Sequence, residues 1–386
     1  MRKIWLTLPV RTRVNNAYSQ HSSYLLKRSG WNIGNLVFRK GLQSIIRDLD
    51  TYSLATWDDL PGIAFDKTDR TVISCANWLG MSSTDEISNR RRADLLEGVK
   101  GRCIAVGLGI QALGGQRIEM GPETIRLAKT LSIKCSTLSV RDDVTLRALA
   151  DIGINNAITT GCPSNFINLA LSRSSFTSGL GRGFGQATRL EDLRLMISEI
   201  SLTASRSSDI IRKTMEILAK SRGSSYVLQT PILIPFLYGE CDSVHPRYRD
   251  GSAYKSIIQH CGRVFSGVDD WLFASRFSDL SFGMRIHGTM VPLQAGVPSI
   301  LLAHDQRTAG LACAMCVPHL TVDEFLAEPI ESMANLMMSR FFSELEQYFI
   351  MRERLAGRFL RVLEACGFQP RIEFERLGQI SEQSCI

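Results

Sequence analysis

Residues 281–303 read SFGMRIHGTMVPLQAGVPSILLA, and this stretch decides the fold. An apolar run at 280–283 predicts a buried strand, and the apolar residues at 287–295 predict the helix that follows it. Gly296 and Pro298 then interrupt the pattern before a second apolar strand at 299–303. A strand, a helix and a strand in close succession predict a βαβ unit, whose two strands run parallel.

The same alternation extends over most of the chain. In the first half, we expect strands at 4–8, 72–76, 103–107, 137–140 and 157–160, and helices at 36–49, 85–99, 122–132 and 144–151. In the second half, we expect strands at 226–230 and 263–266, helices at 190–202 and 209–221, and a helical tail from 321 to 367. This pattern predicts an α/β protein with parallel sheets that helices cover on both faces.

A Ser- and Gly-rich stretch at 172–185 has no apolar periodicity and predicts a linker. We therefore expect an N-terminal α/β domain at 1–175, a C-terminal α/β domain at 186–330 and a helical segment at 331–386. A length of 386 residues agrees with two domains of ordinary size.

The composition excludes several classes of protein. With 44% hydrophobic and 22% charged residues, the chain has ample material for a core and does not resemble a disordered protein. No stretch approaches the ~18 consecutive apolar residues of a spanning helix, and the first apolar run is too short for a signal peptide. The ten cysteines are typical of small buried side chains in a reducing compartment. We expect a cytoplasmic protein with at most peripheral contact at the inner face of a membrane.

The charge balance favours an anionic ligand. Forty-five Lys and Arg against 38 Asp and Glu give a formal charge of +7. No basic run exceeds the arginines at 90–92, a triplet typical of a solvated helix face, so nucleic acid is disfavoured as a partner. The sequence does not indicate the oligomeric state.

Arg285 and His287 follow the strand at 280–283, where ligands bind in open α/β sheets. Two residues apart in extended chain, they would point the same way. A charged guanidinium beside a titratable imidazole suits an anionic substrate that needs a proton moved. A surface arginine and a capping histidine explain the same pattern.

Arg141 also follows a predicted strand and offers a second cation for such a site, although Asp142 beside it suits a helix cap or an ion pair with Arg141. Gly109 lies in a glycine-rich loop after the strand at 103–107, where a ligand can approach the backbone. The turn at 32–35, which includes Asn35, is placed to border the same cleft.

Other motifs give weaker evidence of function. Cys313, Cys316 and His319 imitate a metal site, but a second pair at zinc-like spacing is missing and the surroundings are apolar. His304 and Asp305 after the strand at 299–303 suit a turn and a pocket equally. The sequence contains no P-loop, no G-x-S-x-G elbow and no H-E-x-x-H pair, so P-loop ATP chemistry and serine hydrolysis have no local support.

Together, Val140-Arg141-Asp142, Arg285-x-His287-Gly288 and the Ala-Gly-Val-Pro at 295–298 resemble the polysaccharide pyruvyl transferase family. The similarity runs from residue 32 to about residue 310. One departure is Cys162, in Gly-Cys-Pro, where many members carry Gly-Asp-Pro. The resemblance implies a GT-B-like fold, with two Rossmann-like domains facing across a cleft and C-terminal helices packing back toward the first.

The resemblance also implies a reaction: the enolpyruvyl group of phosphoenolpyruvate passes to two hydroxyls of a sugar, giving a pyruvate ketal and phosphate. The acceptor would belong to a surface polysaccharide or a lipid-linked precursor. Arg141 and Arg285 would hold the donor and His287 would be the acid or base, with Gly109, Gly288 and Asn35 completing the substrate-binding set. No metal or cofactor is required in principle. The alternatives are a GT-B glycosyltransferase using a nucleotide sugar and a non-catalytic carbohydrate-binding relative.

Overall fold

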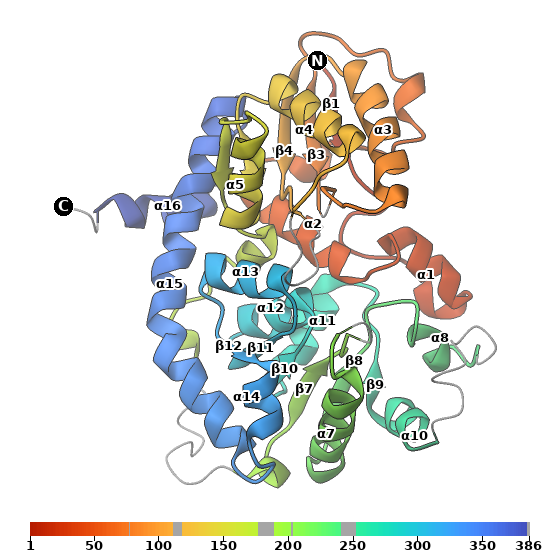
Figure 1. The fold of residues 1–386 in the computed structure, drawn as a ribbon, viewed down its shortest axis with the longest axis vertical. Helices are drawn as coiled ribbons and strands as arrows, with labels where there is room; N and C mark the ends of the chain where they lie inside the picture. The colour runs from red at the N-terminus through yellow and green to blue at the C-terminus, as the bar shows by residue number, and fades with distance from the viewer. Residues whose placement is uncertain (77, 111–117, 177–188, 202–203, 241–251, 384–386) are drawn as a thin grey trace.

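Two parallel sheets form the upper and lower halves of the molecule in Figure 1. The computed structural model describes residues 1–76, 78–110, 118–176, 189–201, 204–240 and 252–383. The predicted linker at 172–185 therefore lies largely outside the described residues.

The upper sheet has the strand order β2-β1-β3-β4, with every pair parallel. A parallel pair, β5-β6, continues it beside β4 through a bridge between Leu108 and Val140. The bounds are β1 Lys3–Leu6, β2 Ser53–Ala55, β3 Arg70–Ser74, β4 Arg102–Val106, β5 Leu138–Val140 and β6 Ala157–Thr159.

The lower sheet has the order β12-β11-β10-β7-β8-β9 and is also parallel throughout. Its central strands, β10 and β7, are fully buried, as apolar strands covered on both faces should be. The bounds are β7 Leu195–Ser198, β8 Ser225–Val227, β9 Gly262–Arg263, β10 Leu280–Gly283, β11 Ser299–Ala303 and β12 His319–Thr321.

Helices connect the strands and cover the sheets (Figure 1). The upper half has α1 Ser22–Ser29, α2 Gly34–Ile45, α3 Ser83–Glu97, α4 Pro122–Lys134 and α5 Asp143–Asp151. The lower half has α7 Ser207–Lys220, α8 Ile234–Leu237, α10 Ser252–Cys261, α11 Val268–Ser275, α12 Ile286–Gln294, α13 Gln306–Met315 and α14 Val322–Ala327. The chain ends in α15 Met333–Cys366 and α16 Ile372–Gln383.

Helix α15 ties the two halves together. Its 34 residues span roughly 51 Å at 1.5 Å per residue, and it contacts β11 of the lower sheet and β4, β5 and β6 of the upper one. From this helix, the buried Arg352 donates to the carbonyls of Asn165 (3.1 Å) and Asn168 (2.7 Å). The fold is thus GT-B-like, as the family resemblance implies: two Rossmann-like halves with C-terminal helices that return to the first.

The prediction of a helix at 190–202 is wrong. The structure has a short 3-10 turn at Leu190–Asp192 and then strand β7, Leu195–Ser198, in the middle of the lower sheet. A short apolar run fits a buried strand and a buried helix equally well, and here the pairing with β8 and β10 decides for the strand.

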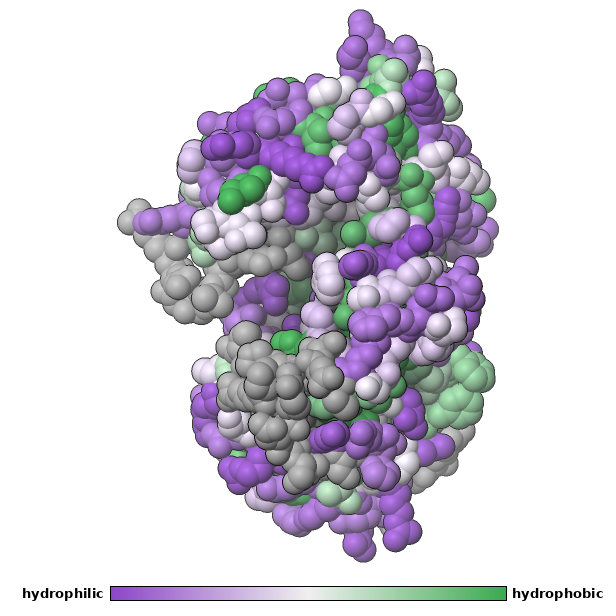
Figure 2. Space-filling model, turned by 90° about the vertical axis from the view of Figure 1, so that its right-hand side faces the viewer, coloured by the Kyte–Doolittle hydropathy of each residue, from purple (hydrophilic) through white to green (hydrophobic). Residues whose placement is uncertain are grey.

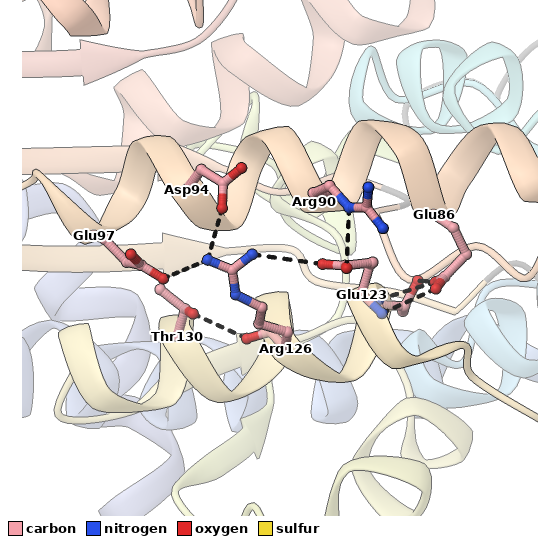
Figure 3. A network of polar contacts seen from close by, with 8 residues as sticks. Glu86, Arg90, Asp94, Glu97, Glu123, Arg126 and Thr130 are labelled. Atoms are coloured by element: carbon pink, nitrogen blue, oxygen red, sulfur yellow. Dashed lines mark hydrogen bonds and ion pairs between the residues drawn. The ribbon is translucent and has the colours of Figure 1, made fainter.

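Arg90 and Arg91 lie on a solvated helix face, as expected, but Arg92 is half-buried and its guanidinium lies over the ring of Trp78, 4.9 Å from the centroid. Arg90 pairs with Glu123 of α4 at 3.0 Å (Figure 3), and Arg91 pairs with Asp58. Nearby, Arg126 of α4 joins both Asp94 and Glu97 of α3 at 2.6 Å. Exposed pairs of this kind are worth about 0–1 kcal/mol each, so they orient α3 on α4 more than they stabilise the fold.

Among the described residues, no helix is both long and apolar enough to cross a membrane.

Candidate anion and proton-transfer site

A small cavity of about 60 Å³ lies between the two halves, where strands of both sheets reach their carboxyl ends. It is lined by Asn32, Asn35, Gly109, Ile110, Arg141, Asp142, Gln229, Met284, Arg285, Ile286, His287, Arg307, Thr308 and Leu311. Five of the six residues predicted from the sequence meet there: Asn35, Gly109, Arg141, Arg285 and His287.

Arg141 comes from the upper half, directly after β5, and its side chain is buried. The guanidinium lies over the ring of Phe38 in α2, 5.5 Å from the centroid, and this contact fixes its direction. Gly109 allows the close approach, because a Cβ there would lie 3.1 Å from Cδ of Arg141. The neighbouring Asp142 caps α5 by accepting from the backbone N–H of Thr145 at 2.7 Å.

Arg285 comes from the lower half, between β10 and α12, and its Nη2 donates to Glu199 at 3.3 Å. Glu199 follows β7 and is fully buried. It also accepts from the backbone N–H groups of Gln229 (2.7 Å) and Thr230 (3.0 Å) and from the Thr230 hydroxyl. One carboxylate therefore holds Arg285 and the end of β8 in a fixed relation, while the buried Nε of Arg285 has no hydrogen-bond partner among the described residues.

Arg307, in the first turn of α13, is a third cation on the cavity wall. Burial and the positive charges of Arg141 and Arg285 lower its pKa, while Asp305 opposes that effect. The sequence analysis missed Arg307, although Asp305 two residues earlier marks the start of a helix at a sheet edge. That aspartate accepts from Thr308 N at 2.7 Å and caps α13.

His287 lies in the first turn of α12 and is buried. Arg285 just before this helix is extended, so the two residues are not both in extended chain as the spacing suggested, yet both line the cavity. Burial, together with the charges of Arg141 and Arg307, lowers the pKa of His287 to about 3. The imidazole is therefore neutral near pH 7, and it becomes an effective proton acceptor only when a bound anion offsets the charges of the two arginines.

Two small residues enclose the imidazole of His287. Its Nε2 lies 3.6 Å from Sγ of Cys162. On the other side is Gly34, the first residue of α2, where an added Cβ would lie 2.4 Å from Nδ1. The ring therefore fits only because position 34 has no side chain.

The remaining predicted residues differ in their contacts. Asn35 lines the cavity, and its amide nitrogen donates to the carbonyls of Ser29 (3.0 Å) and Gly30 (3.3 Å). Gly288 is not among the lining residues: an added Cβ would lie 2.2 Å from Cβ of Ser198, so the glycine lets α12 pack on the end of β7.

The His304–Asp305 pair and the candidate metal ligands are not part of the cavity lining. His304 lies 3.5 Å from the carboxylate of Asp305 behind the cap of α13, and it does not line the cavity. Within the described ranges, no group of three or more His, Cys, Asp or Glu side chains is arranged to hold a metal ion.

The geometry thus defines an α/β protein with three arginines and a neutral histidine in the cleft between two Rossmann-like halves. The model of the polysaccharide pyruvyl transferase family matches residues 32–306, which is most of the chain. The chain belongs to this family of transferases. No curated protein matches it in sequence.

Several solved structures are similar in fold. A trehalose-6-phosphate synthase matches with a TM-score of 0.46 and 11% identity, over 82% of this chain and 77% of that one. S. aureus MnaA with UDP gives 0.40 and 11%, over 81% and 84%. A UDP-N-acetylglucosamine 2-epimerase gives 0.38 and 11%, over 84% and 77%. At these TM-scores and identities, the likenesses say nothing of what this chain binds.

Proposed function

We propose that the protein transfers the enolpyruvyl group of phosphoenolpyruvate to two hydroxyls of one sugar, forming a pyruvate ketal and releasing phosphate. The observation that carries the proposal is the meeting of Arg141, Arg285 and Arg307 around His287 in one small cavity. Three cations held close together are unfavourable in the empty protein. Their arrangement is explained by a ligand that carries several negative charges within a few ångströms, as phosphoenolpyruvate does.

The size of the cavity favours a small donor over a nucleotide sugar. About 60 Å³ holds roughly four to six water molecules at ~10–15 Å³ each, which suits a compact molecule. Sites for larger ligands usually measure about 300–1,000 Å³.

Two helices add to the attraction for an anion. Helices α2 and α12 begin beside the cavity with Gly34 and Ile286, so the positive ends of their dipoles lie near an anion bound there, although the N–H of Gly34 itself donates to Oδ1 of Asn32 at 2.9 Å. Neither helix has an acidic residue in its first turn to compete for this position.

The reaction needs three steps that these residues can support. A sugar hydroxyl adds to C2 of the donor and C3 gains a proton; the C2–O bond to phosphate breaks; a second hydroxyl then closes the ketal. Of the two hydroxyl protons, one balances that gained by C3 and the other that gained by the released phosphate. Neutral His287 is placed to take the first hydroxyl proton, and the arginines stabilise the charge on the departing phosphate.

Binding of phosphoenolpyruvate tests the donor. Saturating phosphoenolpyruvate should raise the unfolding temperature of the wild-type protein, and the rise should vanish in Arg285→Ala. The matched control is Arg212→Ala, because Arg212 is an exposed arginine with one helical ion pair at 3.4 Å. Stabilisation by UDP-glucose or GDP-mannose, with none by phosphoenolpyruvate, would contradict the proposal and favour a glycosyltransferase.

Phosphate release tests the chemistry. Added sugar acceptors should trigger release of phosphate from phosphoenolpyruvate by the wild-type protein, and both Arg285→Ala and His287→Ala should abolish it. Unchanged release in either variant would contradict the assignment of that residue.

A further inference from the structure

A second concave surface, of about 740 Å³, lies on the side of the molecule that carries α1 and α8. We name it the Tyr18 groove; residues 18–21 of the upper half and residues 237–238, 240 and 262–264 of the lower half line it. Figure 2 shows this side of the molecule, and its surface is hollowed between the two lobes. The groove takes its lining from both halves of the chain, yet it shares no lining residue with the anion cavity.

Tyr18 is an exposed aromatic ring held in a fixed position. Its side chain is 63% exposed, but its hydroxyl donates to the carbonyl of Val264 at 2.8 Å and accepts from Ser266 N at 3.3 Å. A further depression of about 590 Å³, lined in part by Asn15 and Asn16, also borders Tyr18. A flat ring immobilised between two depressions is preorganised to stack on a ligand at little cost in entropy.

The polar groups of the groove suit an uncharged ligand rich in hydroxyls. Glu240 and Arg263 are the two formal charges among its lining residues, so they cancel. Glu240 accepts from the backbone N–H of Ser22 at 2.7 Å and lies 3.2 Å from Nε2 of His21. An anion or a nucleic acid would require an excess of positive charge, which the described lining residues do not supply. A pyranose ring fits the pattern, because its C–H face packs on an aromatic ring and its hydroxyls pair with carboxylate, amide and hydroxyl groups.

The distance to the anion cavity follows from the sheet. Arg285 follows β10 and Val264 follows β9, and the order β10-β7-β8-β9 separates these strands by three steps. At ~4.8 Å per step, the ends of β10 and β9 beside the two sites are about 14 Å apart along one sheet edge. We take this as a span of roughly two to three linked pyranose rings.

We propose that the Tyr18 groove binds a sugar of the acceptor chain that is two or three units away from the sugar receiving the pyruvate. This inference rests on the proposed function and makes the acceptor an oligosaccharide or a longer chain. A single sugar would reach the anion cavity without contacting Tyr18.

Binding of defined glycans tests the groove. The probes are short oligosaccharides ending in glucose, galactose, mannose or N-acetylglucosamine, displayed on an array, with the tightest one then titrated against purified protein. Tyr18→Ala should weaken that binding about tenfold or more, while Tyr18→Phe, which keeps the ring, should stay within about threefold. Phe273→Ala is the matched control, since Phe273 on α11 is also 63% exposed and does not line the groove. It should bind as the wild type does.

Stabilisation by phosphoenolpyruvate, measured in the same variants, separates the two proposals. Tyr18→Ala should keep the full rise in unfolding temperature. If phosphoenolpyruvate stabilises the protein but no glycan binds, or if Tyr18→Ala binds the glycan as tightly as wild type, the groove is wrongly assigned and the proposed function stands. If phosphoenolpyruvate does not stabilise the wild-type protein, the proposed function fails instead.

Discussion

Replacing Arg307 by Gln separates a binding role from a structural one. A binding role predicts weaker binding of the ligand with no loss of stability, whereas a structural role predicts unchanged binding and a lower free energy of unfolding. Arg307 lines the cavity with Arg141 and Arg285, and the charges of those two arginines help to lower its pKa. Its own counter-ion is distant, with Nη2 at 3.8 Å from the Asp305 carboxylate. Removing the third cation should therefore weaken the binding of an anionic ligand. It should also relieve the repulsion among the arginines in the ligand-free protein.

The size of the effect follows from the contact that is lost. A hydrogen bond to a charged group contributes about 1.5–3 kcal/mol. Arg307→Gln should thus weaken the binding of phosphoenolpyruvate about tenfold to 150-fold. A typical substitution at a partly buried position costs about 1 kcal/mol of stability, but here the relief of like-charge repulsion offsets it. The free energy of unfolding without ligand should therefore not fall.

Two measurements decide the matter. Calorimetric titration with phosphoenolpyruvate gives the affinity, and urea unfolding of the ligand-free protein gives the stability. Arg212→Gln is the control for loss of an exposed arginine and should change neither. A variant that binds phosphoenolpyruvate within twofold of wild type but unfolds more easily would refute this reasoning and make Arg307 a structural residue.

Two further predictions concern His287 and its neighbour. The pKa of His287 is lowered to about 3 in the folded protein, so between about pH 6.5 and 3 the unfolded chain binds a proton that the folded chain does not. The free energy of unfolding should thus fall by about 2 kcal/mol more from pH 7 to pH 5 in wild type than in His287→Gln; equal slopes in urea unfolding would contradict the low pKa. Gly34→Ala places a Cβ 2.4 Å from Nδ1 of His287 and should reduce phosphate release at least about tenfold, despite the better helix propensity of Ala. Gly62→Ala, with no atom within 4 Å of the added Cβ, is the control, and equal activity in both variants would show that the His287 ring is not confined.

The fold could be predicted where glycine or proline residues clearly mark the ends of apolar runs. Strands β10 and β11 have the predicted bounds, and Gly296 and Pro298 separate β11 from the helix before it. Strand β7 was mistaken for part of a helix, since its four buried residues have no period of their own and only pairing with β8 and β10 makes them a strand. Strand β12 was missed because it lies at the sheet edge and only one of its three residues is buried, so the sequence shows no apolar run there.

The part of the candidate site that follows predicted strands could be predicted, because ligands bind at the carboxyl ends of the strands in open α/β sheets. Arg141 and Arg285 each follow a recognisable strand, so their meeting needed only the assumption that carboxyl ends of the strands face one cleft. Glu199 was missed because it follows the strand that was read as a helix. Arg307 was missed because it lies past a helix cap, and only the direction in which α13 leaves β11 brings it back to the cavity.

The position of Cys162 shows how this residue affects His287. Its sulfur lies 3.6 Å from Nε2 of His287, so the residue that replaces the aspartate of many relatives touches the proposed base. A carboxylate there would stabilise an imidazolium, whereas Cys162 is a weaker partner and Arg141 and Arg307 oppose the charge. In this chain the imidazole therefore begins the cycle neutral. Under the proposed function, a bound donor anion that offsets the two arginines would raise this pKa and so make His287 a better acceptor for the hydroxyl proton.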